Sequence, residues 1–222
     1  MFRRIVVSAC LAGLLGGLVL TGVQWFQVVP IIAQAEIYEP AGTVPKTHSN
    51  GSDHDHAAWA PGEGGERTLW TAVANVGMAI GFALLLAAIF SLRENVTWRQ
   101  GLLWGLGGFA AFFALPAVGL APELPGTATA ALEQRQVWWV MTVAMSAAGL
   151  ALAALGRSWA LKAVGVVLIL APHAVGAPQP ETHSALAPSD LAQTFVFASA
   201  LANAVFWLVL GASSAIAFKK LA

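Results

Sequence analysis

The chain has 222 residues, of which 58% are hydrophobic and only 10% are charged, whereas an ordinary soluble domain carries about 25% charged residues. Its mean hydropathy of +0.71 is too high for a water-soluble surface, and its net charge of zero offers no electrostatic basis for binding nucleic acid. A single cysteine, Cys10, excludes an intrachain disulfide and a metal site of several thiolates within one chain. We therefore expect an all-α, polytopic membrane helical bundle, with residues 1–222 forming one membrane domain in the lipid bilayer.

Six apolar segments are long enough to cross a bilayer, which takes about 20 residues of helix. In chain order they cover residues 5–29, 69–92, 102–121, 137–155, 159–175 and 191–218. The first follows Met-Phe-Arg-Arg, as a signal peptide would. Its length of about 25 residues exceeds the about 7–15 apolar residues of a signal peptide, so we expect a retained helix. Only Gly156-Arg157-Ser158 separates the fourth and fifth segments, which predicts an antiparallel hairpin rather than one long helix.

The distribution of charge predicts how the spans are oriented, because cytoplasmic loops of membrane proteins carry an excess of Lys and Arg. With the N-terminus inside, the inner side carries eight basic residues and the outer side three, whereas ten of the eleven acidic residues lie outside. The inner basic residues are Arg3, Arg4, Arg93, Arg99, Arg157, Lys162, Lys219 and Lys220. We therefore predict six spans with both termini in the cytoplasm. The outer face is then acidic, and all five histidines lie on it or near the outer helix ends.

Pairs of glycines four residues apart can let transmembrane helices approach closely. The predicted spans contain three such pairs, namely Gly13 and Gly17, Gly77 and Gly81, and Gly101 and Gly105. In a chain with 22 glycines this spacing also arises by chance. Each pair is therefore either a packing face or a coincidence.

The interior of the predicted spans contains amides and hydroxyls but no deeply placed Asp, Glu or Arg. A buried carboxylate is common in proton-coupled transporters, and buried arginines serve as voltage sensors, so the sequence indicates neither. The amides are Gln24, Gln27, Asn75 and Asn203, of which the two glutamines are predicted to share one helix face. These side chains either form hydrogen bonds between helices, which the sequence favours, or line a substrate path.

The longest polar segment, residues 30–68, is predicted to be a flexible outer loop, because it contains Pro40, Pro45 and Pro61 and many Gly, Ser and Thr residues. It carries a cluster of imidazoles and carboxylates, Asp53, His54, Asp55 and His56. These groups suit a borderline divalent cation such as Co²⁺, Ni²⁺ or Zn²⁺. The alternative is a solvated loop with adventitious metal affinity, and both interpretations remain open.

His173 is the only histidine within a predicted span, and it follows Pro172 near the outer end of the fifth. It is either a structural residue bonded to a neighbouring carbonyl or a metal ligand on a transport path. A proline can free backbone carbonyls nearby, which favours the second role. His173 is predicted to lie at the same outer level as Gln24 and Gln27, so we expect the path to pass it.

Motifs of catalysis and of nucleotide binding are missing. The sequence has no Gly-x-Ser-x-Gly, no His-Glu-x-x-His and no phosphate-binding loop. A haem or quinone enzyme is a further alternative, but the predicted spans contain no second histidine that could be the other axial haem ligand with His173. We therefore expect that the chain is not an enzyme and does not itself use ATP.

Several short motifs together resemble the CbtA family of cobalt transporter subunits, nearly from end to end. They are Gln27-Val28-Val29-Pro30, Ala35-Glu36-x-Tyr38-Glu39, His54-Asp55-His56-Ala-Ala-Trp59-x-Pro61, Gly65-Glu66-Arg67-Thr68-Leu69 and Pro172-His173-x-x-Gly176-x-Pro178-x-Pro180-Glu181. One small departure is Glu63-Gly64-Gly65, where the family would have an acidic residue directly before the Gly-Glu-Arg motif.

The resemblance implies cobalt uptake for cobalamin biosynthesis by a multi-pass protein of the bacterial inner (cytoplasmic) membrane. It also implies a small, single-span, histidine-rich partner subunit. On this basis we expect a membrane subunit of a divalent metal transporter that captures Co²⁺ at its acidic, histidine-bearing outer face. The metal is cargo, and no permanently bound cofactor is expected. The alternative is a metal-responsive membrane scaffold or assembly factor without transport activity.

Overall fold

A computed structural model of the protein describes residues 1–39, 61–62, 64–93 and 95–221. Within these ranges the chain is all-α, with a single isolated bridge between Thr127 and Ala185 and no strand, which confirms the predicted fold class. The helical segments are α1 (Phe2–Val23), η1 (Gln24–Val28), α2 (Val29–Glu36), α3 (Gly65–Ser91), α4 (Trp98–Phe109), η2 (Ala110–Ala114), α5 (Leu115–Gly119), α6 (Leu132–Leu155), α7 (Trp159–Val175) and α8 (Ser189–Lys220).

The protein is a helical membrane bundle. Five continuous helices of the described chain are long and apolar enough to cross a membrane, namely Phe2–Glu36, Gly65–Ser91, Trp98–Gly119, Leu132–Leu155 and Ser189–Lys220. The sixth apolar helix, α7, has 17 residues, close to the lower limit of about 17 for a span. α6 and α7 are separate helices joined by a short turn, so the predicted hairpin is confirmed.

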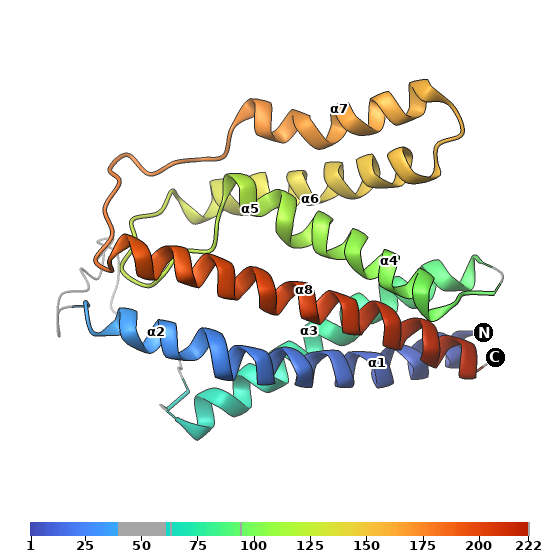
Figure 1. Ribbon diagram of the computed structural model, residues 1–222, viewed down its shortest axis with the longest axis horizontal. Helices are drawn as coiled ribbons and strands as arrows, with labels where there is room; N and C mark the ends of the chain where they lie inside the picture. The colour runs from blue at the N-terminus through green and yellow to red at the C-terminus, as the bar shows by residue number, and fades with distance from the viewer. Residues whose placement is uncertain (40–60, 63, 94, 222) are drawn as a thin grey trace, which may run out of the picture.

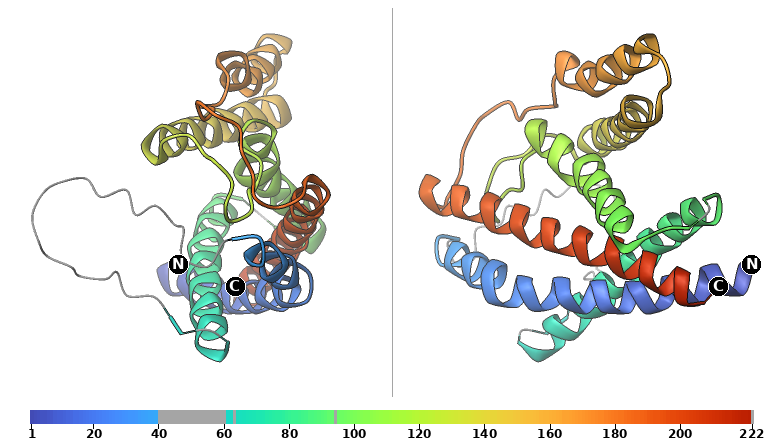
Figure 2. Two further views of the ribbon diagram at one scale, coloured as in Figure 1. Left: turned by 90° about the vertical axis from the view of Figure 1, so that its left-hand side faces the viewer. Right: turned by 45° about the vertical axis from the view of Figure 1, so that its right-hand side comes forward.

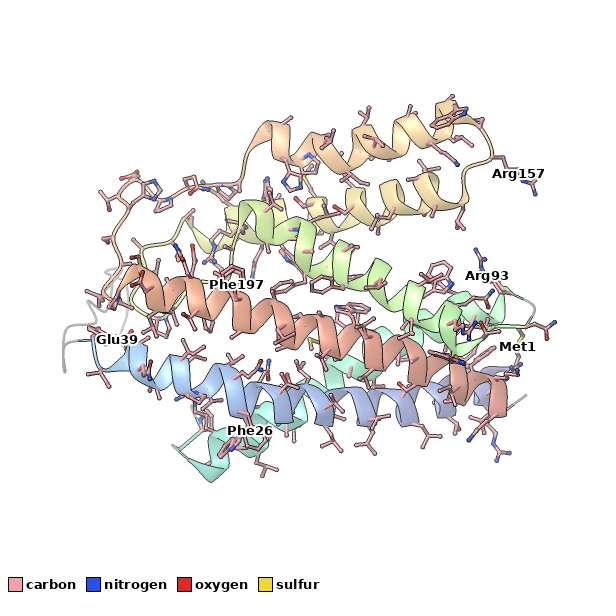
Figure 3. All side chains as sticks on the ribbon, viewed as in Figure 1. Met1, Phe26, Glu39, Arg93, Arg157 and Phe197 are labelled. Carbon is pink, nitrogen blue, oxygen red and sulfur yellow. The ribbon has the colours of Figure 1, made fainter. Side chains whose placement is uncertain are left out.

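The six long helical units alternate in direction along the bundle (Figure 1). Met1, Arg93 and Arg157 lie at one end, and Glu39 lies at the other (Figure 3). Both termini are therefore at the same end of the bundle, as six spans would require (Figures 1 and 2). Which end faces the cytoplasm stays a prediction.

Two long helices contain a π-helical turn that ends two residues before a proline. η1 precedes Pro30 in the first helix, and η2 precedes Pro116 in the third. Proline is tolerated in the first turn of the α-helical segment that follows, where its missing N–H costs little. As a result the first helix continues through Pro30 to Glu36, and residues 30–36 do not belong to a flexible loop as predicted.

Helices α1, α3, α4 and α8 form the main bundle, around a core that includes Leu20, Phe90, Phe206 and Leu210. The α6–α7 hairpin lies beside it, with α6 against α5 and η2 and with α7 on its far side (Figures 1 and 2). Glycine residues allow close contact between α1 and α3, between α4 and α8, and between α6 and α7.

The predicted glycine pairs have different outcomes. A Cβ on Gly17 would lie 2.5 Å from Cα of Val76, and one on Gly13 would lie 2.5 Å from Cα of Ile80, so this pair packs against α3. Gly101 and Gly105 pack in the same manner against α8 at Gly211. No atom lies within 4 Å of a Cβ on Gly77 or Gly81, so the third pair is not a packing face within the described chain.

Candidate functional site

A polar cluster joins the first helix to α3 inside the bundle. The side chain of Asn75, on α3, is 9% exposed, and its Nδ2 donates to Oε1 of Gln24 at 2.7 Å and to Oγ1 of Thr21 at 3.1 Å. The Thr21 hydroxyl in turn donates to the carbonyl oxygen of Gly17 at 2.8 Å. We call Thr21, Gln24 and Asn75 the amide cluster.

The close approach at Gly17 positions this cluster. Gly17 contacts the backbone of Val76, the residue that follows Asn75, so the helix axes are close where the amide must reach across. Thr21 lies one turn after Gly17, and Gln24 begins the η1 turn. π-Helical turns inside α-helices occur frequently at functional sites.

The cluster brings together three neutral oxygen-bearing side chains within a membrane bundle. Polar side chains buried at membrane depth are costly, so each is expected either to form a hydrogen bond between helices or to take part in function. The assignment of Nδ2 and Oδ1 in an asparagine amide follows from its hydrogen bonds. If the Asn75 amide rotates by half a turn, Oδ1 joins Oε1 of Gln24 and Oγ1 of Thr21, and three oxygens then face one point. Such an arrangement can interact with a cation.

The other predicted path-lining amides do not join the cluster. Gln27 is exposed, because the wider π-helical turn separates its direction from that of Gln24. Asn203 donates from Nδ2 to the carbonyl oxygen of Ser199 at 2.9 Å, one turn earlier in its own helix. Thr21 was not among the side chains predicted to line a path. It lies four residues after Gly17 and three before Gln24, and this helical spacing indicates that the three residues share one face.

His173 lies in a different part of the bundle. Its ring meets that of Trp138 on α6 edge to face, with ring centroids 6.0 Å apart. The His173 Nε2 and the Trp138 Nε1 are both buried without a hydrogen-bond partner among the described residues. A cavity of about 480 Å³ lies beside Trp138, with Glu133 and Gly176 in its lining.

The structure therefore does not bring His173 to the amide cluster. Helix α7 packs on α6 at one side of the bundle, and α1 lies at the other (Figures 1 and 2). This arrangement does not support a single path with His173 and the amide cluster together at its outer entrance.

The loop cluster Asp53, His54, Asp55 and His56 lies outside the described residues. Among the described residues, Glu36 at the end of α2 pairs with Arg67 at the start of α3, at 3.1 Å between Oε1 and Nη1. Within residues 1–39, 61–62, 64–93 and 95–221, no group of three or more His, Cys, Asp or Glu is arranged to hold a metal ion. The metal role of the loop stays a prediction.

Comparison with known families adds the decisive observation. A family model described as "Probable cobalt transporter subunit (CbtA)" matches residues 2–219. The chain belongs to the CbtA family. The matched range includes every motif on which the resemblance was based and, apart from the last residue of α8, all described helices of this CbtA protein. No curated protein and no solved structure matches it.

Proposed function

We propose that this CbtA protein is the membrane subunit of a divalent cation uptake transporter whose substrate is cobalt, and that it has no enzymatic activity. Membership in the family over residues 2–219, in a chain folded as a multi-helix membrane bundle, is the observation that carries the proposal. We place the protein in the bacterial inner membrane, where imported cobalt would supply cobalamin biosynthesis.

Capture of the cation begins, in this proposal, at the end of the bundle that carries Glu39. An acidic surface raises the local concentration of cations. The acidic residues that the structure describes all belong to segments at this end, namely Glu36, Glu39, Glu66, Glu123, Glu133, Glu181 and Asp190. Asp53, His54, Asp55 and His56 supply carboxylate and imidazole ligands for a first, weak binding step. A small, single-span, histidine-rich subunit, implied by the family resemblance, would add further imidazoles there.

The amide cluster is the proposed next contact on the path. It offers neutral oxygen atoms below the acidic surface, and the absence of a charge among them favours weak binding and release. His173 is the alternative contact, on a path at the other side of the bundle, because its Nε2 is buried without a partner among the described residues and its ring meets Trp138, which lines the cavity of about 480 Å³.

One observation favours the alternative function, a metal-responsive scaffold or assembly factor without transport. One cavity lies beside Trp138, and a second lies between α5, α6 and α8. Both are at the Glu39 end of the bundle, where α6 begins, and no residue in their linings belongs to the opposite end. A metal bound at that end could be sensed without crossing the membrane.

Cobalt accumulation in cells separates the two functions. Cells that express the chain with its partner subunit are compared with cells that lack the chain, at equal protein levels for every variant. We expect the chain to raise Co²⁺ accumulation and Asn75→Leu to lower it about 10-fold, which corresponds to about 1.4 kcal/mol. Asn203→Leu is the matched control, because its amide bonds only within α8. Equal accumulation with and without the chain would exclude transport and support the scaffold.

A further inference from the structure

A large groove opens at the Glu39 end of the bundle. It has a volume of about 1090 Å³ and lies between α5 and α6 on one side and the first residues of α8 with α2 on the other (Figure 1). Its walls are mainly apolar and include Phe113, Ala117, Trp139, Val140 and Phe195. We call this cavity the end groove.

Two ion pairs lie at the rim of the end groove. Arg135 donates from one terminal nitrogen to Oε2 of Glu123 at 2.9 Å, and both residues line the groove. Arg67, also in the lining, pairs with Glu36 at 3.1 Å. Each guanidinium is thus matched by a carboxylate, so the rim has no net charge although it carries both signs.

The shape and polarity of the end groove suit an amphiphile. Its volume is at the upper limit of ordinary ligand pockets, about 1,000 Å³, and its apolar walls continue to side chains exposed on the outside of α6, such as Val140 and Leu132. Helix ends with Trp138 and Trp139 are typical of the membrane interface, where lipid headgroups lie. Because lipid tails meet an apolar environment in the bilayer as well, an apolar wall alone cannot select one lipid, and selection must come from the rim.

The chemistry of the rim distinguishes between headgroups. A guanidinium has five N–H donors, and the bond from Arg135 to Glu123 uses one of them, so the same group can also hold a phosphate. Oε1 of Glu123 can accept from an ammonium group. An anionic phosphoglycerol headgroup could use the same free donors of Arg135, but it would add a net negative charge beside the Glu123 carboxylate and has no ammonium group to balance that charge. A quaternary ammonium has no N–H to donate.

We propose that the end groove binds a zwitterionic aminophospholipid. One acyl chain lies against Phe113, Trp139 and Phe195, the phosphate contacts Arg135, and the primary ammonium contacts Glu123. This site is independent of the proposed transport function, since it shares no residue with the amide cluster or with the loop histidines.

Native mass spectrometry of the full chain, purified in detergent, tests the proposal. The protein is titrated with phosphatidylethanolamine, phosphatidylcholine and phosphatidylglycerol that carry identical acyl chains. We expect the dissociation constant of the first bound phosphatidylethanolamine to be at least about 10-fold lower than that of phosphatidylglycerol. Equal constants for the three lipids, or a preference for phosphatidylglycerol, would overturn the proposal.

Two sets of variants locate the site. Ala117→Trp fills the groove and is expected to abolish the preference, whereas Val118→Trp, at the neighbouring residue of α5, which is 74% exposed and outside the lining, is expected to keep it. Ala117→Leu is a smaller filling variant, in case the tryptophan variant does not fold. Glu123→Gln is expected to remove the preference for phosphatidylethanolamine over phosphatidylcholine, and Arg157→Gln, at the opposite end, is the charge control. Retention of the preference in both Ala117 variants would refute the location.

Discussion

The contact between Gly17 and α3 gives the sharpest quantitative prediction. In Gly17→Ala the new methyl group would lie 2.5 Å from Cα and 2.7 Å from the backbone nitrogen of Val76, and ordinary contact begins at 3.4 Å. Since the obstructing atoms belong to the backbone, no side-chain rotation relieves the overlap. The helices α1 and α3 must therefore move apart by about 1 Å.

This displacement has two consequences for stability. Overpacking costs about 1–3 kcal/mol. A separation of about 1 Å would also lengthen the bonds from Asn75 to Gln24 and Thr21, now 2.7 and 3.1 Å, beyond hydrogen-bond range. Hydrogen bonds between membrane helices contribute about 0.6 kcal/mol each on average. We therefore expect Gly17→Ala to destabilise the protein by about 2–4 kcal/mol.

Reversible unfolding in mixed detergent micelles, followed by circular dichroism, measures this difference. Gly77→Ala is the matched control, because no neighbouring element lies within 4 Å of the added methyl group, and it is expected to keep stability or raise it by up to about 1 kcal/mol, since alanine favours a helix over glycine. The reasoning fails if Gly17→Ala and Gly77→Ala are equally stable.

Three further predictions follow from the topology and the metal ligands. In a background with Cys10→Ser, a membrane-impermeant thiol reagent should label Asn50→Cys from outside the cell and should not label Arg157→Cys, and the reverse pattern would contradict the orientation. A peptide of residues 46–60 should bind Co²⁺ weakly, and binding should decrease as the pH falls through about 6.5, because a ligand imidazole must be neutral. If a peptide in which alanine replaces both His54 and His56 binds equally well, the loop site is disproved. His173→Gln, which keeps the polarity but changes the ligand, should reduce Co²⁺ uptake, and undiminished uptake at normal protein levels would make His173 structural.

Much of the fold was predictable because it depends on local properties of the chain. The length of an apolar segment that crosses a membrane is set by the thickness of the bilayer, so composition alone indicated the five long apolar helices and the shorter helix α7. The turn at Gly156-Arg157-Ser158 likewise separates α6 from α7 as expected. The first span was predicted to end at residue 29, directly before Pro30, and this prediction is wrong. The helix continues to Glu36, because Pro30 lies in the first turn of the α-helical segment that follows the π-helical turn.

The candidate site was only partly predictable. Gln24 and Asn75 were recognised as polar residues within spans, but their hydrogen bond joins residues that are 51 positions apart in the sequence. Gln27 and Asn203 carry the same amide group and do not take part, because one is turned outward by the η1 turn and the other bonds within α8.

The sequence by itself determined that the protein is helical, that it belongs in a membrane, and that its basic and acidic residues segregate to different ends. The tertiary structure decided which glycine pairs are helix contacts and which polar side chains meet. Gly13 and Gly17 have the same spacing as Gly77 and Gly81, yet only the first pair faces a neighbouring helix. The physical reason is that a residue pattern fixes which side chains share a face of one helix, whereas the neighbour that this face meets depends on the packing of the whole bundle.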